Sequence, residues 1–429
     1  MADKGTTKLV FLMEIGFVHP GSPTAEGVGS NNSATKIVQE LVDRGHDITV
    51  FALYPGDASS NSREYDLEVL DLGSDYTSKL QRGQVLEKKL KRRVRQFETF
   101  DVAHAYAPLA VPGMAHIAKY TSTPTVIGLN AYDAICPKKD LLHMNETRCS
   151  GNGVAKCTKC ITHSAVTSPL YETCSPLMYA PTFGYLTLRR FNTLRHVLRS
   201  EKVANEIDAY HTLSPHLKEK YVNFGFPESK FHIIPNLLDE RFLVDQPTDS
   251  ASPPYQLLYV GSLLEKKGVR KLLPMFERLH ARSPNEYTLT IAGDGPWQSS
   301  LEAEVKKRGL TSHVAVLGRV PYSNVPSLYG AHDLFVYPGR WDEPFARVFL
   351  EALASGTPIV GSDVGDLKQI VGDAGVVTDG TPESLADEIT RLIAADALPA
   401  MSSAAVNRAK IYQPTDVIDR YEELYEILT

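Results

Sequence analysis

Short apolar runs alternate with amphipathic helical patterns over the first 130 residues. Lys8–Met13 has the length and composition of a buried strand, and a glycine-containing loop that reaches Gly29 follows it. A helix is predicted over Ser33–Arg44, with Gly45 as its stop signal. Further strands are predicted at Asp47–Leu53, Glu68–Leu72, Asp101–Ala105 and Pro124–Leu129. This alternation is typical of a parallel sheet covered by helices on both faces.

The same pattern begins again after residue 230. Six more strands are predicted, with helical segments between them: Gln256–Val260, Thr288–Ala292, Val314–Leu317, Leu334–Tyr337, Pro358–Gly361 and Gly375–Val377. The chain is therefore predicted to be an α/β protein with two doubly wound Rossmann-like domains in series.

We expect the first domain to cover residues 1–213 and to carry a cysteine-rich insert at about 133–175. The second domain is expected at 214–411, because Ser214–Pro215 interrupts the pattern. Residues 412–429 contain an amphipathic helix, which needs a surface to cover its apolar side. We expect this helix to pack back on the first domain.

Composition narrows the class of protein. Of the 429 residues, 43% are hydrophobic and 22% are charged, which is ordinary for a folded globular chain. A formal charge of −6 is too mild for a nucleic-acid coat, so no nucleic-acid partner is expected. No stretch approaches ~18 consecutive apolar residues, and the start lacks the pattern of a signal peptide. We therefore expect a cytoplasmic protein.

Positive charge is concentrated in one predicted helix. Residues 79–95 hold eight Lys and Arg against a single acid, Glu87. Leu86, Leu90 and Val94 recur through it at helical spacing. The segment is either a solvated helix face or a contact with anionic lipid headgroups. The second interpretation predicts a peripheral location on the cytoplasmic face of a membrane.

The most informative stretch of the second half runs from Glu343 to Glu351, after an apolar strand that ends at Tyr337. Pro344 suits the first helical position, and a helix N-terminus directly after a strand can bind an anion. Eight residues separate the two glutamates, which is ~12 Å along a helix at ~1.5 Å per residue. Carboxylates so placed could accept hydroxyl hydrogen bonds from the two ends of a polyol-bearing diphosphate. Two surface acids on an ordinary helix would show the same spacing.

Glycine turns end several strands of the second half. Gly261 and Gly268 bracket a strand-to-helix turn in which Lys267 is a candidate point charge for phosphate. Gly293 follows the next strand, and Arg319 follows the one after that. All of these turns fall at the carboxyl ends of parallel strands, where open α/β sheets bind ligands.

Residues 343–375, EPFARVFLEALASGTPIVGSDVGDLKQIVGDAG, resemble the signature region of the family 4 retaining glycosyltransferases. Val260–Val269, Gly293–Pro296 and Ile234–Asn236 match other parts of the family pattern in the same order, so that the resemblance covers nearly the whole chain. It implies the GT-B fold, in which two Rossmann-like domains face each other across a cleft. It also implies a retaining, metal-independent hexosyltransferase that uses a nucleotide-diphosphate sugar, UDP- or GDP-linked, and a saccharide or lipid-linked acceptor.

The resemblance also implies roles for single residues. Glu343 would hold hydroxyls of the donor sugar and Glu351 the nucleotide ribose, while Lys267 would bind the diphosphate. Arg319 falls where the family places the base. The donor-binding positions are Gly29, Gly261, Ser262, Lys267, Gly293, Arg319, Phe345, Ala346, Arg347 and Glu351. Of these, Phe345, Ala346 and Arg347 would present backbone N–H groups to the diphosphate.

Several positions depart from the family pattern. Ser262 replaces a frequent arginine, and we hypothesise that Arg347 partly restores this charge. Ala346 replaces a glycine and crowds the diphosphate modestly. Asn130 stands where the family has a histidine near the reacting sugar; it can form hydrogen bonds but cannot titrate. His104 ends another strand and is either an active-site residue or a packing histidine.

Two alternatives to a glycosyltransferase stay open. Ser262 and Asn130 would suit a nucleotide-sugar-binding or scaffold protein that has lost catalysis. A nucleotide-sugar epimerase on the same fold is a second enzyme hypothesis, but the pair formed by Glu343 and Glu351 favours transfer.

Four cysteines fall within 25 residues of the first half: Cys136, Cys149, Cys157 and Cys160. In a cytoplasmic loop, four thiolates with one CxxC pair predict a structural zinc or Fe–S site more than disulfides. Buried or reactive free thiols are the alternative. Some family 4 members carry a similar insert after the same strand, so a structural metal could order a loop on the acceptor side. Cys174 is left over and is expected to be a packing thiol.

Overall fold

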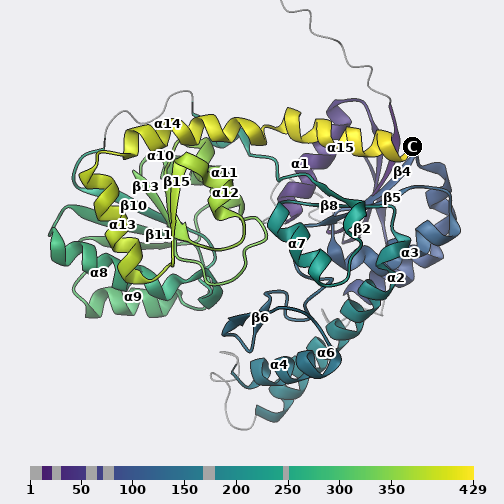
Figure 1. Cartoon of the computed structure of the whole chain (residues 1–429), viewed down its shortest axis with the longest axis horizontal. Helices are drawn as coiled ribbons and strands as arrows, with labels where there is room; N and C mark the ends of the chain where they lie inside the picture. The colour runs from purple at the N-terminus through teal and green to yellow at the C-terminus, as the bar shows by residue number, and fades with distance from the viewer. Residues whose placement is uncertain (1–11, 22–29, 55–64, 71–81, 168–178, 245–250) are drawn as a thin grey trace, which may run out of the picture. The chain divides into compact units, whose positions relative to one another are not determined.

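The computed structural model describes residues 12–21, 30–54, 65–70, 82–167, 179–244 and 251–429 (Figure 1). The chain divides into two compact units. Unit 1 holds Met1–Pro235 together with Ile418–Thr429, and unit 2 holds Asn236–Val417. Each unit is built on one parallel sheet, as predicted from the alternation of strands and helices.

Unit 1 contains a seven-stranded sheet in the order β3-β2-β1-β4-β5-β8-β9. All of its pairings are parallel. Its strands are β1 (Glu14–Gly21), β2 (Asp47–Tyr54), β3 (Asp66–Val69), β4 (Val102–Ala105), β5 (Thr125–Leu129), β8 (Ala209–Thr212) and β9 (Phe231–Ile233). The central strands are buried along their length, which requires helices on both faces.

The first strand lies later in the chain than predicted. Residues 12 and 13 have no strand structure, and β1 begins at Glu14 and includes Gly16, which was expected in a loop. A Cβ atom on Gly16 would lie 2.8 Å from the ring of Phe100, so the strand needs glycine where this ring packs against it. The glycine therefore marks a close approach rather than a turn.

The helices of unit 1 are α1 (Ser30–Asp43), α2 (Arg82–Arg92), α3 (Val111–Tyr120), α4 (Val154–Val166), α6 (Tyr179–Val203) and α7 (Pro215–Asn223). A short 3₁₀ helix, Val94–Thr99, follows α2. Between β5 and β8 the chain forms the small hairpin β6 (Leu142–His143) and β7 (Thr147–Arg148), then α4 and α6. Figure 1 shows α4 and the first part of α6 as an arm that projects from the sheet of unit 1.

The boundary between the units differs from the prediction. It falls after Pro235 instead of Leu213, because β8 and β9 both belong to the sheet of unit 1. Ser214 and Pro215 do not end a domain. Ser214 caps α7, its hydroxyl accepting the N–H of Leu217, and Pro215 occupies the first turn of that helix.

The last helix, α15 (Pro414–Leu428), begins in unit 2 and ends in unit 1. Its part in unit 1 buries Tyr421 and Tyr425. The carboxylate of Glu422 accepts hydrogen bonds from Arg44 at 2.7 Å and from His46 at 3.2 Å. Aromatic packing and a buried ion pair thus attach this segment to the unit.

Unit 2 contains a six-stranded parallel sheet in the order β12-β11-β10-β13-β14-β15. Its strands are β10 (Tyr255–Val260), β11 (Tyr287–Ala292), β12 (Val314–Gly318), β13 (Leu334–Tyr337), β14 (Ile359–Ser362) and β15 (Gly375–Thr378). Its helices are α8 (Leu272–Arg282), α9 (Gln298–Lys307), α10 (Val325–Gly330), α11 (Arg347–Ala354), α12 (Leu367–Val371), α13 (Pro382–Ala394) and α14 (Leu398–Ala409). One core joins β10 and β11 to the apolar faces of α8 and α13.

Among the described residues, no single helix is long and apolar enough to span a membrane. Pro382–Ala394 and Leu398–Leu428 together pass that test by length and composition, although they are bent by 103° at the break between them.

Candidate active site

Glycine turns pack tightly against one another at the carboxyl ends of the strands of unit 2. A Cβ atom on Gly293 would lie 1.9 Å from the carbonyl oxygen of Gly261, and one on Gly268 would lie 1.8 Å from that of Pro338. Gly293 and Gly268 also have positive φ values, 140° and 75°. Only glycine fits at these two positions, so the turns after β10, β11 and β13 form one closely packed edge.

Glu343 lies at this edge and is held by three hydrogen-bond donors. Its Oε2 accepts from Lys267 Nζ at 2.5 Å, from the Tyr337 hydroxyl at 2.5 Å and from Trp341 Nε1 at 2.9 Å. Tyr337 ends β13, and Lys267 lies in the turn after β10. In the described part of the chain, no group forms a hydrogen bond with the second oxygen, Oε1. The carboxylate is thus fixed through one oxygen, and the other can accept a ligand hydroxyl.

Electrostatics keeps Glu343 ionised although it is only 7% exposed. Burial raises the pKa of this carboxyl, but Lys267 and the Tyr337 hydroxyl outweigh it and hold the pKa below its ordinary value. The Lys266 ammonium lies 3.7 Å from the centre of the Trp341 ring and that of Lys267 lies 5.4 Å from it. Two cations and two aromatic side chains therefore surround one carboxylate.

Glu351 is buried in a different environment. Its two carboxylate oxygens accept hydrogen bonds from the hydroxyls of Tyr322 at 3.2 Å and Tyr329 at 3.4 Å. Arg347 Nη2 donates to the Tyr322 hydroxyl at 2.9 Å. Burial raises the pKa of Glu351, and attraction to Arg347 offsets this only in part. Two tyrosines thus position this carboxylate and one arginine lies near it.

The N-terminus of α11 lies between the two glutamates in the chain. The helix begins at Arg347, so Pro344 precedes it and is not the first helical residue as predicted. Ala346 is the N-cap, and no side chain caps the helix at this end. Phe345 and Ala346 are buried at 8% and 7% exposure. Ala346 as N-cap therefore offers no side-chain acceptor to the first N–H groups of α11.

The remaining predicted donor positions are less enclosed. Ser262 is exposed, and its carbonyl oxygen accepts the Tyr259 hydroxyl at 3.1 Å. Arg319 is exposed directly after β12. Arg347 donates to the Tyr322 hydroxyl and attracts Glu351. Gly29 lies outside the described residues.

The two candidates in unit 1 have different surroundings. Asn130 directly follows β5 and is half-buried, and its Nδ2 is buried without a hydrogen-bond partner in the described part of the chain. His104 is fully buried. Its ring nitrogens contact the Tyr425 hydroxyl at 2.6 Å and His211 Nε2 at 3.0 Å. Burial lowers the pKa of His104 to about 3. These contacts favour the packing interpretation of His104, and Asn130 keeps a donor for a ligand.

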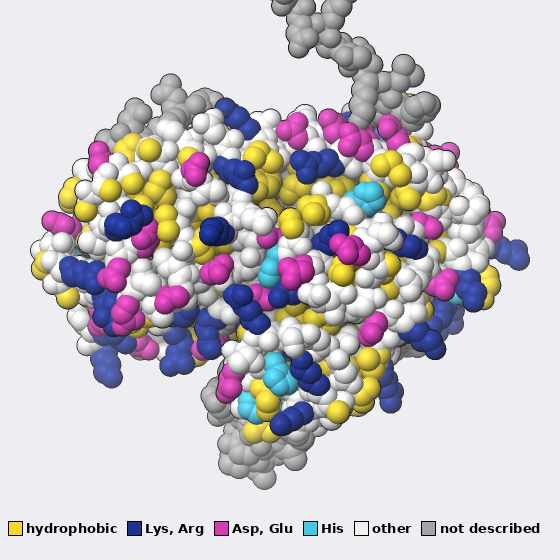
Figure 2. All heavy atoms as spheres, viewed as in Figure 1, with side chains coloured by type: hydrophobic (Ala, Val, Ile, Leu, Met, Phe, Trp, Pro, Cys, Tyr) yellow, Lys and Arg dark blue, Asp and Glu magenta, His cyan; other side chains and the backbone are white. Residues whose placement is uncertain are grey.

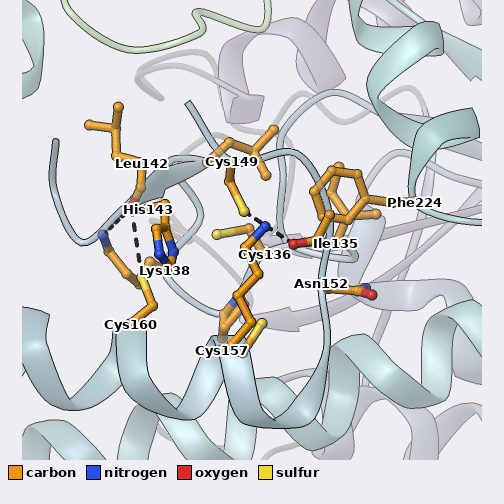
Figure 3. Close-up of a pocket in the computed structure, with 14 residues that line it drawn as sticks. Ile135, Cys136, Lys138, Leu142, His143, Cys149, Asn152, Cys157, Cys160 and Phe224 are labelled. Carbon is orange, nitrogen blue, oxygen red and sulfur yellow. Dashed lines mark hydrogen bonds between the residues drawn. The ribbon is translucent and has the colours of Figure 1, made fainter. Parts of the chain in front are cut away.

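Cys136, Cys149, Cys157 and Cys160 are free and line one pocket (Figure 3). They do not form the arrangement predicted for a metal site. In the part of the chain that the structure describes, no three His, Cys, Asp or Glu side chains come together to hold an ion. Two of the sulfurs instead form hydrogen bonds with separate backbone groups. Cys160 Sγ accepts the Met144 N–H at 3.2 Å, and Cys149 Sγ donates to the Gly151 carbonyl at 3.2 Å. Cys174 lies outside the described residues.

Sequence reasoning missed the aromatic partners of the two glutamates. Tyr337 and Trp341 precede Glu343 by six and two residues, and Tyr322 and Tyr329 reach Glu351 from another loop and helix. A signal for the first pair was present, because an aromatic residue ends the strand that leads to the site. Nothing in the pattern indicated the second pair.

Family models match both halves of the chain. Residues 28–242 match the model described as Glycosyltransferase Family 4, and residues 241–410 match Glycosyl transferases group 1. O-antigen chain mannosyltransferase B of Escherichia coli is 36% identical over 123 residues, 28% of this chain and 32% of that protein. Glycogen synthase of Mycobacterium tuberculosis is 32% identical over 177 residues, 41% of this chain and 42% of that protein. The matched segment thus spans less than half the length of these relatives.

Solved structures resemble the chain over nearly its whole length. Sucrose-phosphate synthase from Thermosynechococcus elongatus has a TM-score of 0.69 at 17% identity, and the match covers 97% of this chain and 98% of that one. HepE from Anabaena in complex with UDP-glucose has a TM-score of 0.62 at 19% identity, with 96% and 99% covered. At such identities the likeness establishes the fold, and the predicted GT-B fold with its two Rossmann-like sheets is confirmed.

Proposed function

The chain belongs to Glycosyltransferase Family 4, and from that premise we propose that it is a retaining, metal-independent hexosyltransferase. It would transfer a hexose from a nucleotide-diphosphate sugar to a saccharide or lipid-linked acceptor. The match of both halves to glycosyltransferase models supports the reaction class. Within the structure, the strongest support for the proposal is the environment of Glu343.

Glu343 has the properties of a residue that positions a sugar. Three donors converge on Oε2 and restrict the rotation of the carboxylate. Oε1 can then accept a hydroxyl hydrogen bond in a fixed direction, which is the preorganisation that a bound sugar needs at its reacting carbon. A carboxylate that is ionised while buried also attracts the positive charge that develops on the sugar in the transition state.

Lys267 is proposed to stabilise the diphosphate as it leaves. Its ammonium contacts the Glu343 carboxylate directly. The same cation would therefore lie beside the sugar, which Glu343 holds, and beside the diphosphate, which gains negative charge as it leaves. The N-terminus of α11 would add backbone N–H groups from Phe345, Ala346 and Arg347. Glu351 would bind the ribose, and Arg319 would lie beside the base.

The reaction needs no base of its own from this chain. The bond between the anomeric carbon and the diphosphate oxygen breaks, and its electron pair stays on that oxygen. The acceptor hydroxyl forms the new bond on the same face of the sugar and gives its proton to the leaving diphosphate. The protein's task is then to hold the charges in place and to exclude water.

Relatives suggest the donor class. HepE was solved in complex with UDP-glucose, and one curated relative is a mannosyltransferase. For this chain we propose a UDP- or GDP-linked hexose. Arg347 and Tyr322, which lie beside Glu351, are the described side chains best placed to distinguish nucleotides at the ribose end of the site.

Donor turnover tests the proposal. The full chain should release nucleotide diphosphate from at least one member of a panel of UDP- and GDP-hexoses. Glu343→Gln should lower that release by about 10²–10³-fold, the range for removal of one transition-state contact. Glu286→Gln makes the same chemical change at an exposed position of unit 2 and should leave turnover unchanged.

Two results would contradict the proposal. Full turnover by Glu343→Gln would remove the assigned role of this carboxylate. Nucleotide-sugar binding without any release would instead favour a binding or scaffold protein, the alternative that exposed, uncharged Ser262 and non-titrating Asn130 support.

A further inference from the structure

Three helices of unit 1 are unusually basic for a chain with a net charge of −6. α2 has five Lys or Arg and a single carboxylate, Glu87. α6 also has five and a single carboxylate, Glu201. α4 has Lys156 and Lys159 and no carboxylate. Positive charge in unit 1 is therefore concentrated on these helices.

Contacts bring these cations together at one place. Glu87 of α2 forms ion pairs with Arg199 of α6 and Lys91 of α2, both at 2.6 Å. His116 of α3 lies beside them. Partial burial lowers the pKa of His116, and repulsion from Lys91, Lys119 and Arg199 lowers it further. Cations from α2, α3 and α6 thus all lower the pKa of one histidine.

Several of the cations there have no acidic partner. Five form no ion pair with any residue in the described ranges: the exposed Arg92, Arg95, Arg195 and Lys202, and the half-buried Lys89. In unit 2, Arg278, Arg282, Arg308, Arg340 and Arg391 each contact a surface carboxylate. Lys306 and Lys307 of α9 form no ion pair with a described residue, but α9 also carries two glutamates, whereas α2 and α6 carry one carboxylate each against five cations. The unpaired cations define what we call the basic face, formed by α2, the 3₁₀ helix after it and α6.

Apolar side chains are exposed beside the basic face. On α6, Leu188 lies 7, 11 and 14 residues before Arg195, Arg199 and Lys202, a spacing that places all four on one side of the helix. Leu188 is 58% exposed. Tyr120, at the end of α3, is also 58% exposed, and the ammonium of Lys119 lies 5.8 Å from the centre of its ring.

The arm continues this combination of cations and apolar groups. Val154 and Val166, at the two ends of α4, are 63% and 48% exposed. In Figure 2, hydrophobic, Lys or Arg, and His side chains lie close together over the arm. Lysine, arginine and exposed apolar or aromatic side chains on one surface are the pattern of a protein that lies on a membrane.

We propose that the basic face and the arm dock unit 1 on a bilayer that contains anionic lipids. Negative headgroups would pair with the unpartnered cations, and Leu188 and Tyr120 would enter the interfacial layer. An exposed leucine and valines suit acyl chains and offer nothing to a nucleic acid. The chain leaves the sheet for the arm at Asn130, so docking would bring a lipid-linked acceptor to the edge that holds this side chain. This last point rests on the proposed function.

Vesicle flotation of the full chain tests the docking surface. The protein should float with vesicles of phosphatidylcholine and phosphatidylglycerol at low salt, and it should remain unbound with phosphatidylcholine alone or at high salt. Arg92→Gln/Arg95→Gln and Arg195→Gln/Lys202→Gln should each lower the partition coefficient at least tenfold, since each cation contributes about fivefold. Leu188→Ser, added to either double variant, should lower the partition coefficient further.

Lys306→Gln/Lys307→Gln is the matched control, because it removes two exposed cations from α9 in unit 2. It should bind vesicles as the parent does. The proposal is overturned by equal binding to neutral vesicles, by equal losses in the control and the basic-face variants, or by tighter binding to RNA than to anionic vesicles at the same salt concentration.

The two proposals fail separately. Vesicle binding needs no donor, and Glu343→Gln should float like the parent. A protein that docks without turnover contradicts only the proposed function, and one that turns over donor without docking contradicts only the docking surface. The basic-face variants should keep the parent's turnover with a soluble acceptor.

Discussion

At the scale of single residues, the candidate site depends on how one carboxylate is held. Glu343 is nearly buried, yet it stays ionised because an ammonium, a phenol and an indole N–H all meet its Oε2. Each of these donors comes from a different position on the β10 and β13 edges. Removing one should change both the orientation of Oε1 and the charge state of the carboxyl.

Tyr337→Phe tests this arrangement. The substitution removes one hydrogen bond to a charged group, worth about 1.5–3 kcal/mol, so kcat/KM for the donor should fall roughly 10- to 100-fold. The hydroxyl of Tyr337 also lowers the pKa of Glu343. Its loss raises that pKa, and the acid limb of the pH–rate profile should therefore move to higher pH.

Tyr259→Phe is the control for this substitution, because Tyr259 is equally buried on the neighbouring strand β10 and its hydroxyl bonds only a neutral carbonyl oxygen. It should leave the acid limb in place. An unchanged profile in Tyr337→Phe would show that the phenol does not position Glu343.

At the scale of elements, the cysteine-bearing insert shows that the spacing of cysteines in the sequence does not specify what their sulfurs contact in the fold. Cys157 and Cys160 lie on one side of α4, and Cys136 and Cys149 come from the loops before it, so that all four reach one pocket. The sulfurs of Cys160 and Cys149 nevertheless form hydrogen bonds with different backbone groups. All four cysteines are free thiols in this arrangement.

Alkylation measures the state of these thiols. Burial raises the pKa of Cys136 to about 11, so only about a thousandth of it is thiolate at pH 8. We expect Cys136 to react with iodoacetamide far more slowly than in the unfolded chain, and a chelator should not change its rate in reduced protein. The labelled peptides can be followed by mass spectrometry.

Release of about one equivalent of zinc or iron by the chelator, together with faster labelling of all four cysteines, would instead establish the metal site that the spacing predicts.

At the scale of the whole molecule, the C-terminal segment completes unit 1. His104 contacts His211 and Tyr425, so residues more than a hundred positions apart form one buried polar cluster. Burial lowers the pKa of His104 to about 3 and that of His19 to about 4. Both are neutral in the folded chain over the range in which an unfolded histidine becomes charged.

Stability should therefore decrease with acidity. Above the unfolded pKa of ~6.5 both states are neutral at these histidines, and they add no pH dependence. As pH falls below that value, the unfolded chain binds protons that the folded chain cannot accept. At pH 5 each histidine should lower the free energy of unfolding by about 2 kcal/mol relative to pH 7.5. Urea unfolding followed by circular dichroism checks this.

His104→Gln should make the decrease between pH 7.5 and 5 smaller, whatever it does to the stability at pH 7.5. The same slope in the variant and the parent would contradict the assignment of this pH dependence to His104.

The sequence by itself determined the class of fold, the existence of most strands of the two sheets and the place of Lys267 and Glu343 after strands of unit 2, although it missed β8 and β9. These follow from local chemistry, because hydrophobic period sets strands and helices and glycine marks the turns between them. The errors were also local in origin. Gly16 suggested a loop, although Phe100 requires a glycine in the strand, and Ser214 suggested a boundary, although it caps a helix.

Only the tertiary structure decided which groups meet. It placed Tyr337 and Trp341 on Glu343, buried His104 between His211 and Tyr425, and joined the sulfurs of Cys149 and Cys160 to separate backbone groups. It also joined α6 to α2 through Glu87, which turned one basic helix into a basic face. The physical reason is common to all of these. Hydrogen bonds and ion pairs act over a few ångströms, and no local pattern specifies which distant side chains the fold brings within that range.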